Sequence, residues 1–230
     1  MIRSAKAFTL GTALFLAACS GGRETSSSLG AALEATVTIA QDNRETRDRP
    51  EPPPLTRDVI DRIPAPALEV VLEDRGVTGI VVPYASRRDG RNGTITTWRN
   101  GSGSQIVLRD GVLISTRGIG NDLGSSRVDA VVQSINTRQP VSGPHNLFVL
   151  GYANYTTRID LECEMESLGE TRIEIFQRAH SVVHLRQNCV GPDGPVTNDY
   201  WVDRSSNTVW QSRQWAGPDL GYFRIRKLKK

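Results

Sequence analysis

Apolar and polar residues alternate over much of residues 55–230, in short runs rich in Val, Ile, Thr and aromatic side chains. The clearest run is residues 158–166, where every second side chain is apolar, as in a β-strand with one buried face. Pairs such as Asp110-Gly111 separate the runs and favour tight hairpins between antiparallel strands. The other predicted strands cover residues 79–84, 94–98, 106–108, 112–114, 147–153, 171–177, 181–190, 199–203 and 208–214.

This pattern predicts a mainly β fold, in which antiparallel hairpins and meanders pack as a sandwich or as an open barrel. At most one or two short helices are expected. One of them follows Ser126, where Ser126 and Asp129 form a capping-box pattern ahead of an apolar run. Val131 and Val132 in that run would also suit a strand, so both interpretations stay open. Residues 55–230 are predicted to form a single domain.

Residues 1–18 have a different pattern, in which a basic start is followed by an apolar run. Arg3 and Lys6 supply the charges, and residues 7–18 supply the run. Twelve residues are too few for a permanent helix across a bilayer, which needs about 20. The segment is therefore predicted to be an export signal that the mature protein lacks.

The residues that close this signal, Leu16-Ala17-Ala18-Cys19, match the lipobox of bacterial lipoproteins. The resemblance implies cleavage between Ala18 and Cys19, a diacylglycerol thioether on Cys19 and an N-acyl lipid such as palmitate on its amino group. These modifications give the protein three acyl chains. Such an anchor holds the protein stably in the membrane, whereas one acyl chain alone binds a membrane only marginally. Ser20 replaces the Asp that usually retains lipoproteins in the inner membrane, which implies the periplasmic face of a Gram-negative outer membrane. The alternative is a secreted protein with a chance cysteine.

Residues 19–54 are predicted to be a lipidated, flexible tether. Serines and glycines begin the segment, residues 42–51 are largely charged, and prolines from Pro50 to Pro54 oppose regular structure. Random-coil scaling gives the tether a reach of about 30 Å. Residues 29–41 could instead dock on the domain as a helix through a narrow apolar face.

The two remaining cysteines lie on predicted inward faces, Cys163 in the run 158–166 and Cys189 in the run 181–190. In the oxidising periplasm this predicts a Cys163–Cys189 disulfide, with two buried free thiols as the alternative. A simple meander argues against the bond, because the two strands would be about 9–10 Å apart and a disulfide joins Cα atoms within about 7 Å. The bond therefore requires a different strand arrangement.

Net charge excludes one class of partner. The chain carries a charge of +3, and loss of Arg3 and Lys6 leaves 26 basic against 25 acidic residues. So small a net charge does not indicate the strongly basic surface that binding to nucleic acid requires. Basic residues gather near the C-terminus, as a solvated strand or as a contact for anionic lipid or polysaccharide: Arg224, Arg226, Lys227, Lys229 and Lys230.

No catalytic constellation stands out in the sequence. The three histidines lack metal-ligand spacing, and the acidic residues between Asp160 and Glu166 alternate as a solvated strand face would. No nucleophile elbow, phosphate loop or dinucleotide motif occurs. The sequence therefore predicts a protein that is not an enzyme and that has no metal and no cofactor besides its covalent lipid. A periplasmic enzyme acting on glycan stays an alternative.

Aromatic residues gather around the predicted hairpin 199–214. Tyr200, Trp201, Trp210 and Trp215 could form a platform on which sugar rings rest, because an aromatic ring offers an apolar face beside a polar group. The more usual role of Trp and Tyr in an all-β domain is core packing, which is the alternative.

Two blocks resemble a known family. Residues 111–123 read GVLISTRGIGNDL, and residues 198–203, 209–215 and 217–218 read NDYWVD, VWQSRQW and GP. With the lipobox, these blocks resemble the YjbF/GfcB-type lipoproteins, the group 4 capsule polysaccharide lipoprotein family, over essentially the whole domain. Asn207 stands where the family usually has Gly, and Asn tolerates the left-handed conformation of such a turn.

The resemblance implies a mainly β outer-membrane lipoprotein that serves exopolysaccharide or capsule secretion or assembly as a non-enzymatic accessory. The expected partners are the membrane, through the lipid, and either polysaccharide or proteins of the export machinery. The family offers no established catalytic residue, so Cys19 alone carries over with a chemical role. A purely structural envelope lipoprotein is the remaining alternative.

Overall fold

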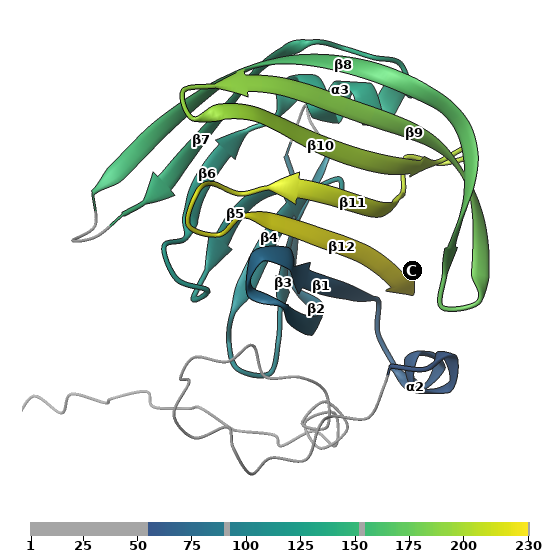
Figure 1. The fold of residues 1–230 in the computed structure, drawn as a ribbon. Helices are drawn as coiled ribbons and strands as arrows, with labels where there is room; N and C mark the ends of the chain where they lie inside the picture. Colours follow the sequence, from purple (N-terminus) through teal and green to yellow (C-terminus); the bar gives the residue numbers. More distant parts are fainter. Residues whose placement is uncertain (1–54, 90–92, 152–154, 230) are drawn as a thin grey trace, which may run out of the picture.

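The computed structural model describes residues 55–89, 93–151 and 155–229. The predicted export signal (1–18) and tether (19–54), with its candidate helix at 29–41, lie outside the described residues. Twelve strands form one antiparallel sheet with the order β5-β4-β3-β2-β1-β12-β11-β10-β9-β8-β7-β6. The sheet curls into a nearly closed barrel (Figure 1). The mainly β prediction is confirmed, and of its two architectures the barrel is the right one.

The elements follow one another as a meander. In chain order they are α2 (Arg57–Arg62), β1 (Ala67–Leu72), the 3-10 helix η2 (Glu73–Arg75), β2 (Val77–Arg88), β3 (Thr94–Arg99), β4 (Gln105–Arg109), β5 (Val112–Arg117), β6 (Leu123–Arg127), α3 (Asp129–Thr137), β7 (Gly143–Leu150), β8 (Thr156–Ile175), β9 (Arg178–Gly191), β10 (Gly194–Asp203), β11 (Val209–Trp215) and β12 (Tyr222–Lys229). Strands pair with their sequence neighbours, except that β1 pairs with β12 and that β5 and β6 end the ladder.

Strand β8 corrects the predicted strand pattern. The predicted strands 158–166 and 171–177 imply a turn between them at Leu168-Gly169, but one strand runs through this point and carries a β-bulge there. Phe176 and Gln177 form the actual turn, with φ values of 45° and 65°. The prediction was wrong because bulges and tight turns both use glycine at positive φ, and Gly169 has a φ of 87°.

The interior follows the predicted alternation. Ile159, Leu161, Cys163 and Met165 are buried, and the acidic residues between them are exposed. Ile159, Leu161 and Cys163 join a core with side chains from nearly every strand, Phe223 of β12 among them, and Met165 packs in the neighbouring cluster with α3. The period-two pattern therefore predicted correctly which face of β8 lies inside.

A second core lies outside the barrel wall. The tip of the β8–β9 hairpin curves toward the C-terminal end of β12 (Figure 1). There Ile175 and Val182 pack in a cluster with Ile60 of α2. Arg178 of the hairpin also forms an ion pair with Asp61 of α2, with 3.1 Å between Nη2 and Oδ1. These contacts fix α2 against the barrel.

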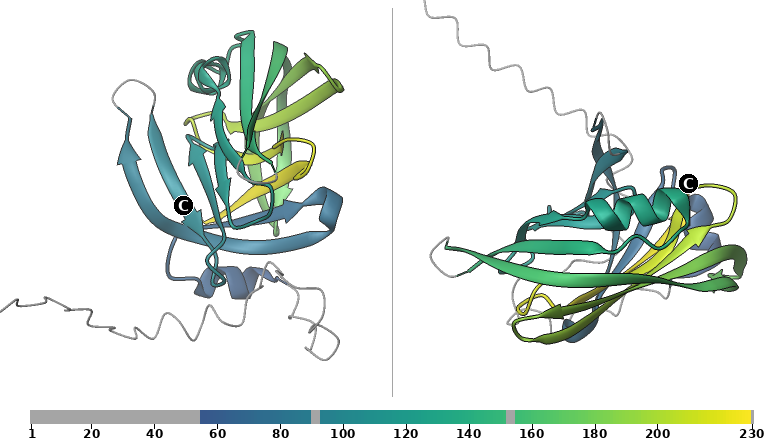
Figure 2. Two further views of the ribbon diagram at one scale, coloured as in Figure 1. Left: turned by 90° about the vertical axis from the view of Figure 1, so that its left-hand side faces the viewer. Right: turned by 90° about the horizontal axis from the view of Figure 1, so that it is seen from above.

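Helix α3 covers part of one end of the barrel (Figure 2). Its buried residues Val131, Val132 and Ile135 pack on side chains that point inward from β10, Tyr200 and Val202. The predicted helix is confirmed, which settles the choice between helix and strand for this segment.

The predicted capping box of α3 is wrong. Val128 occupies the N-cap position without a side-chain hydrogen bond. Ser126 instead lies in β6, where its hydroxyl bonds His145. Burial of Val128 in the core replaces the polar cap, because a tertiary contact outweighs a local one here.

The two ends of the barrel are built differently, and we name them. The mouth is the end with α3, the β4–β5 turn at residues 110–111 and the β10–β11 connection at residues 204–208. The base is the other end, with η2 and the connections 118–122 and 216–221. Arg75 ties these three together, because Nη1 donates to the Ile119 oxygen (2.6 Å) and Nη2 to the Asp219 oxygen (3.1 Å).

Side chains close the seam between β5 and β6 at the base. Asp122 accepts hydrogen bonds from Thr116 Oγ1 (2.7 Å), Gly118 N (2.7 Å) and Ile119 N (3.2 Å). Leu123 N in turn donates to Thr116 Oγ1 (3.0 Å). Asp122 is buried, so these bonds satisfy groups that water would not reach.

Candidate functional site

Ala18 and Cys19, the predicted cleavage and lipidation residues, lie outside the described residues. The described chain starts on the mouth side of the barrel, where α2 adjoins the last residues of β12. Lys229 Nζ donates there to the Ile63 oxygen (2.9 Å) and the Asp61 oxygen (3.4 Å). Arg226 pairs with the buried Glu69 of β1. These two members of the C-terminal basic cluster therefore serve internal contacts.

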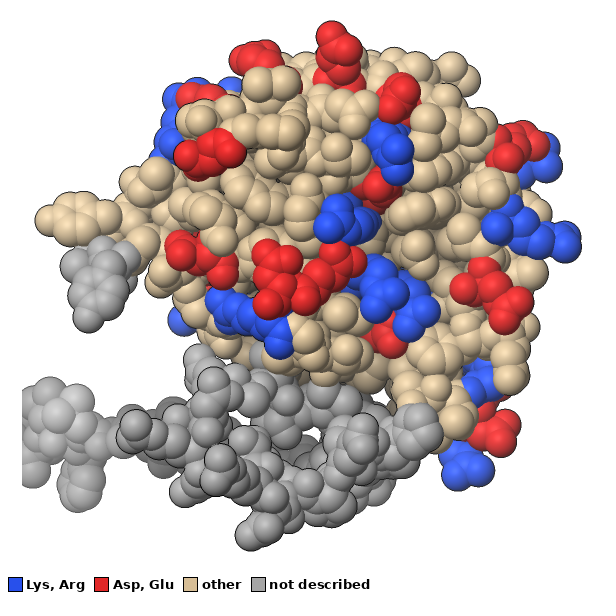
Figure 3. All heavy atoms as spheres, in the orientation of Figure 1, with Lys and Arg blue, Asp and Glu red and all other residues tan. Residues whose placement is uncertain are grey.

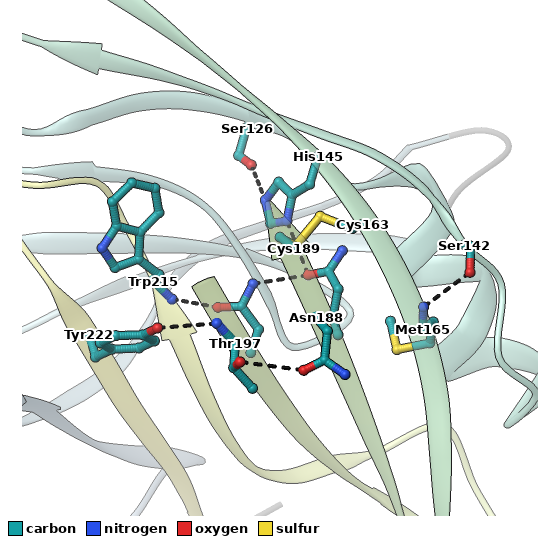
Figure 4. Close-up of a disulfide and its surroundings, with 12 residues drawn as sticks. Ser126, Ser142, His145, Cys163, Met165, Asn188, Cys189, Thr197, Trp215 and Tyr222 are labelled. Carbon is teal, nitrogen blue, oxygen red and sulfur yellow. Dashed lines mark hydrogen bonds between the residues drawn. A yellow bond between two sulfur atoms is a disulfide. The ribbon is translucent and has the colours of Figure 1, made fainter. Parts of the chain in front are cut away.

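The Cys163–Cys189 disulfide is present, with 2.04 Å between the sulfur atoms and 4.0 Å between the Cα atoms (Figure 4). The two cysteines face each other directly on β8 and β9. The objection based on a three-strand meander fails because residues 171–175 continue the strand that carries Cys163, so β9 is its direct neighbour.

A buried polar network lies beside the disulfide (Figure 4). His145 Nδ1 contacts Gln187 Oε1 (3.2 Å), which also accepts from Asn198 Nδ2 (2.9 Å). Because Oε1 can only accept, Nδ1 carries the proton, and Nε2 accepts from Ser126 Oγ (2.8 Å). Asn198 Oδ1 accepts from the Trp215 backbone (2.8 Å). Burial lowers the pKa of His145, although the bond to Gln187 opposes the shift.

Ser126 and His145 are placed as a nucleophile and its base would be, and Ser126 borders an open, polar hollow of about 440 Å³ with Arg109 and Arg127. The third member of such a set normally stabilises an imidazolium with a carboxylate. Here that position holds the neutral amide of Gln187, and burial lowers the pKa of His145. The arrangement therefore favours a structural role over general-base catalysis.

Two of the predicted platform residues are buried. Tyr200 is 0% exposed on the inner face, and burial raises the pKa of its hydroxyl. Trp210 lies in the outer core against the ring of His180, with 3.7 Å between ring centroids. Its Nε1 donates to Asp203 Oδ2 (2.8 Å). Neither ring can receive a sugar, because both are covered by protein.

The other two aromatic residues lie apart. Trp201 is half-buried on the outer face of β10 and stacks on His184, with 4.5 Å between ring centroids. Trp215 borders a small cavity of about 160 Å³ beside the β9–β10 turn. A platform made of all four residues is therefore wrong. A β-bulge between β10 and β11 turns Trp210 outward, which simple alternation does not predict.

Charge on the outer face is balanced. Asp199 Oδ1 accepts from His184 Nε2 (2.7 Å) and Arg186 Nε (2.8 Å), and the Asp199 hydrogen bond raises the pKa of Arg186. Basic and acidic side chains are interspersed over the face in Figure 3. This face therefore offers no broad field of one sign.

A cavity of about 350 Å³ opens at the mouth. Its polar wall includes Thr94, Thr96, Asp110, Thr208, Ser212 and Lys227. Its apolar wall includes Leu68, Trp98, Leu108 and Ile225. The residues of α3 are not part of the wall, so the cavity occupies the half of the mouth that the helix leaves open. Ligand pockets commonly enclose about 300–1,000 Å³ and combine apolar walls with a few polar groups.

The β10–β11 connection, which borders this cavity, is held by Asp203. Its Oδ1 accepts from Ser205 N (3.0 Å) and Ser206 N (2.9 Å). Burial would raise the pKa of Asp203, but hydrogen bonds from Trp210, Ser205 and Ser206 outweigh it and hold this pKa below its usual range. Asn207 is fixed as well, because its Oδ1 accepts from Arg138 Nη1 (2.7 Å).

The sequence did not join the cavity residues into one site, although Lys227 belongs to the C-terminal basic cluster named above. One signal was available in β3, whose period of two places Thr94, Thr96 and Trp98 on one face. The remaining wall comes from strands far apart in the chain, which no local pattern joins. Among residues 55–89, 93–151 and 155–229, no helix has the length and apolar character needed to cross a membrane. The same residues contain no cluster of three or more His, Cys, Asp or Glu suited to a metal ion.

Comparisons with known proteins give the chain a structural neighbour and a family. A solved structure of a hypothetical lipoprotein, YmcC from Escherichia coli K12, aligns with a TM-score of 0.66 and 18% identity over 76% of this chain and 89% of that one. At this identity the likeness concerns the fold. No curated protein matches the chain. The model of the family described as group 4 capsule polysaccharide lipoprotein gfcB, YjbF matches residues 27–228. The chain therefore belongs to the group 4 capsule polysaccharide lipoprotein family.

Proposed function

We propose that the protein is a non-enzymatic accessory of capsule or exopolysaccharide secretion. It is held by the lipid on Cys19 at the periplasmic face of the outer membrane, and its barrel meets polysaccharide or proteins of the export machinery. The observation that carries the proposal is the family match over residues 27–228, in a chain that also has the lipobox at residues 16–19.

The geometry supports an anchored binding domain. Residue 55 and α2 lie on the mouth side of the barrel, and the tether of residues 19–54 would reach about 30 Å from the lipid. The mouth cavity therefore opens on the same side of the barrel as residue 55. A binding role needs such an accessible cavity and does not need the carboxylate that the Ser126–His145 pair lacks.

Deletion of the gene with quantification of secreted polysaccharide tests this function. We expect the amount of polysaccharide outside the cell to fall at least about tenfold, and the full-length gene to restore it. Unchanged secretion in the deletion strain would contradict the proposal and favour a purely structural lipoprotein of the envelope.

Two variants test the anchor separately from the barrel. Cys19→Ser removes the lipidation site, so the protein should lose labelled lipid and fail to restore secretion. Ser20→Asp keeps the lipid but should retain the protein in the inner membrane. Lipid label on the Cys19→Ser protein, or full secretion by both variants at normal protein levels, would refute the role of the outer-membrane anchor.

A Ser126→Ala variant tests the enzymatic alternative. The substitution removes the only hydroxyl that bonds His145 Nε2 among the described residues, and Ser126 is half-buried, so the fold should survive. We expect secretion equal to the wild type. Lost secretion with an unchanged melting temperature would instead favour an enzyme that uses Ser126.

A further inference from the structure

We propose that the mouth cavity binds an uncharged, hydroxyl-rich sugar unit of a glycan chain through Trp98, Thr94, Thr96, Asp110 and Lys227. This inference rests on the proposed function and deepens it, because it names the ligand class and the residues that hold it. The polysaccharide platform predicted around Trp201 and Trp210 is not involved.

The strand register arranges the cavity from polar rim to apolar floor. Thr94, Asp110 and Lys227 lie at the strand ends that form the mouth. Trp98 and Ile225 lie deeper along the same inward faces. A ligand that enters therefore meets hydrogen-bonding groups first and an apolar surface below them.

This gradient suits the two kinds of surface on a sugar ring. The ring carries hydroxyl groups around its edge and C–H groups on its faces, and the apolar floor of the cavity can contact the latter. Trp98 is 7% exposed and packs in the core, so together with Leu108 and Ile225 it contributes part of the apolar floor and not a free stacking face. Thr96 lies two residues nearer the rim on the same face.

The charges on the wall match an uncharged ligand. The wall contains one carboxylate, Asp110, and one ammonium group, Lys227. Asp110 Oδ1 accepts from Thr94 N (2.9 Å), which fixes the carboxylate at the rim. A hydroxyl group both donates and accepts, so it can serve both charged groups, whereas an anionic sugar would face the Asp110 carboxylate.

The walls are fixed before a ligand arrives. Gly111 has a φ of +92°, and a Cβ at this position would lie 2.7 Å from the Val209 side chain, so the β4–β5 turn packs directly on β11. The β10–β11 connection, which leads into Val209, is held by Asp203 and by the hydrogen bond from Arg138 to Asn207. A preformed cavity reduces the entropy lost on binding.

A matched pair of variants tests the site. Thr96→Tyr places a ring in the cavity, and Thr97→Tyr places the same ring on the opposite face of β3, because neighbouring residues alternate. The ligand is an oligosaccharide mixture released by partial acid hydrolysis from the exopolysaccharide of the producing strain. Binding is measured by calorimetry on the full, lipidated protein in lipid nanodiscs.

We expect the wild type and Thr97→Tyr to bind alike and Thr96→Tyr to bind at least about tenfold more weakly. Because the proposed ligand is uncharged, raising the salt from about 0.05 M to 0.5 M should change the Kd less than about twofold. Equal binding by Thr96→Tyr, absence of binding by the wild type, or a tenfold loss of affinity with salt would overturn the proposal.

Two further measurements test the role of Lys227 and the alternative of a lipid ligand. Lys227→Met keeps the length of the side chain and removes its donors, so it should weaken binding several-fold. Because Lys227 also interacts within the protein, binding is compared at a temperature at which the wild type and the variant are both folded. Wild-type affinity in this variant would contradict the assignment. Fatty acid that co-purifies with the wild type and not with Thr96→Tyr would show a lipid site instead and overturn the assignment to sugar.

Failure of the site and failure of the function give different outcomes. If deletion of the gene leaves secretion unchanged, the proposed function fails whatever the binding data are. If deletion abolishes secretion but the Thr96→Tyr gene restores it and the variant binds oligosaccharide normally, the function stands and the cavity assignment alone is wrong.

Discussion

The base and the mouth of the barrel differ in how their polar groups are used. At the base, Asp122 and Arg75 join neighbouring connections through hydrogen bonds, and Ile119 closes the interior from below. At the mouth, α3 covers one half, and the other half is a cavity with Asp110 and Lys227 on its wall.

This difference separates polar groups that stabilise the barrel from polar groups that could bind a ligand. Polar groups that bond one another inside a protein stabilise it, because an unpaired partner would lose water without compensation. Polar groups that line an open cavity can exchange water for a ligand. Substitutions at the base should therefore lower the free energy of unfolding more than substitutions of open cavity residues such as Thr96, which should mainly change binding.

The largest effect is expected from the disulfide, which lies two residues from the base end of β9. Replacement of Cys163 and Cys189 by Ala should lower the free energy of unfolding by about 3 kcal/mol, because the bond closes a loop in the unfolded chain. Urea unfolding under oxidising conditions measures the loss. Reductant should destabilise the wild type similarly and leave the double variant unchanged; an effect on both would mean that the disulfide is not the cause.

The seam at the base should come next. Asp122→Ala removes the acceptor of three hydrogen bonds and leaves buried donors unpaired, so we expect a loss of about 2–3 kcal/mol in the free energy of unfolding. Asp219→Ala, an exposed carboxylate at the same end, is the matched control and should change stability by less than about 0.5 kcal/mol. Equal losses in both variants would contradict the role of Asp122.

Acid should weaken the buried network through His145. Its pKa in the folded state is lowered, so below the unfolded value of about 6.5 the unfolded chain binds a proton that the folded chain does not. The free energy of unfolding should therefore fall as the pH drops, by up to about 1.4 kcal/mol per pH unit. Denaturation of His145→Gln between pH 7 and pH 5 should lack this slope, and a parallel profile would refute the assignment.

The smallest effect is expected at the tip of the β8–β9 hairpin, on the mouth side. Gln177 is exposed and has a φ of 65°, which glycine adopts without steric cost. Gln177→Gly should raise the free energy of unfolding by up to about 1 kcal/mol. Gln133→Gly on the exposed face of α3 is the opposite control and should lower it by about 1 kcal/mol.

Local features of this fold could be predicted from the sequence. Alternation in β8 identified its buried face and Asp110-Gly111 identified a hairpin, whereas the apolar run after Ser126 left helix and strand open until the structure showed α3. These features depend on residues close together in the chain, so the sequence records them directly.

Long-range features could not be predicted in the same way. Alternation shows that one face of a strand is buried but not whether a facing sheet or the same curved sheet covers it, so barrel and sandwich looked alike. The bulges at Gly169 and beside Trp210 shift the alternation without a distinct local signal. The cavity joins Thr94, Ser212 and Lys227 from three separate strands, and only the closed barrel brings them together.

The pairing of β1 with β12 has a consequence for how the chain reaches its final state. Every other ladder forms between consecutive strands, so these hairpins can assemble as the chain emerges. Strand β1 must wait until residues 222–229 arrive, and until then both β1 and β11 present open edges that invite pairing with other chains. A product truncated before β12 would therefore leave the edges of β1 and β11 unpaired, and would be prone to aggregation and proteolysis.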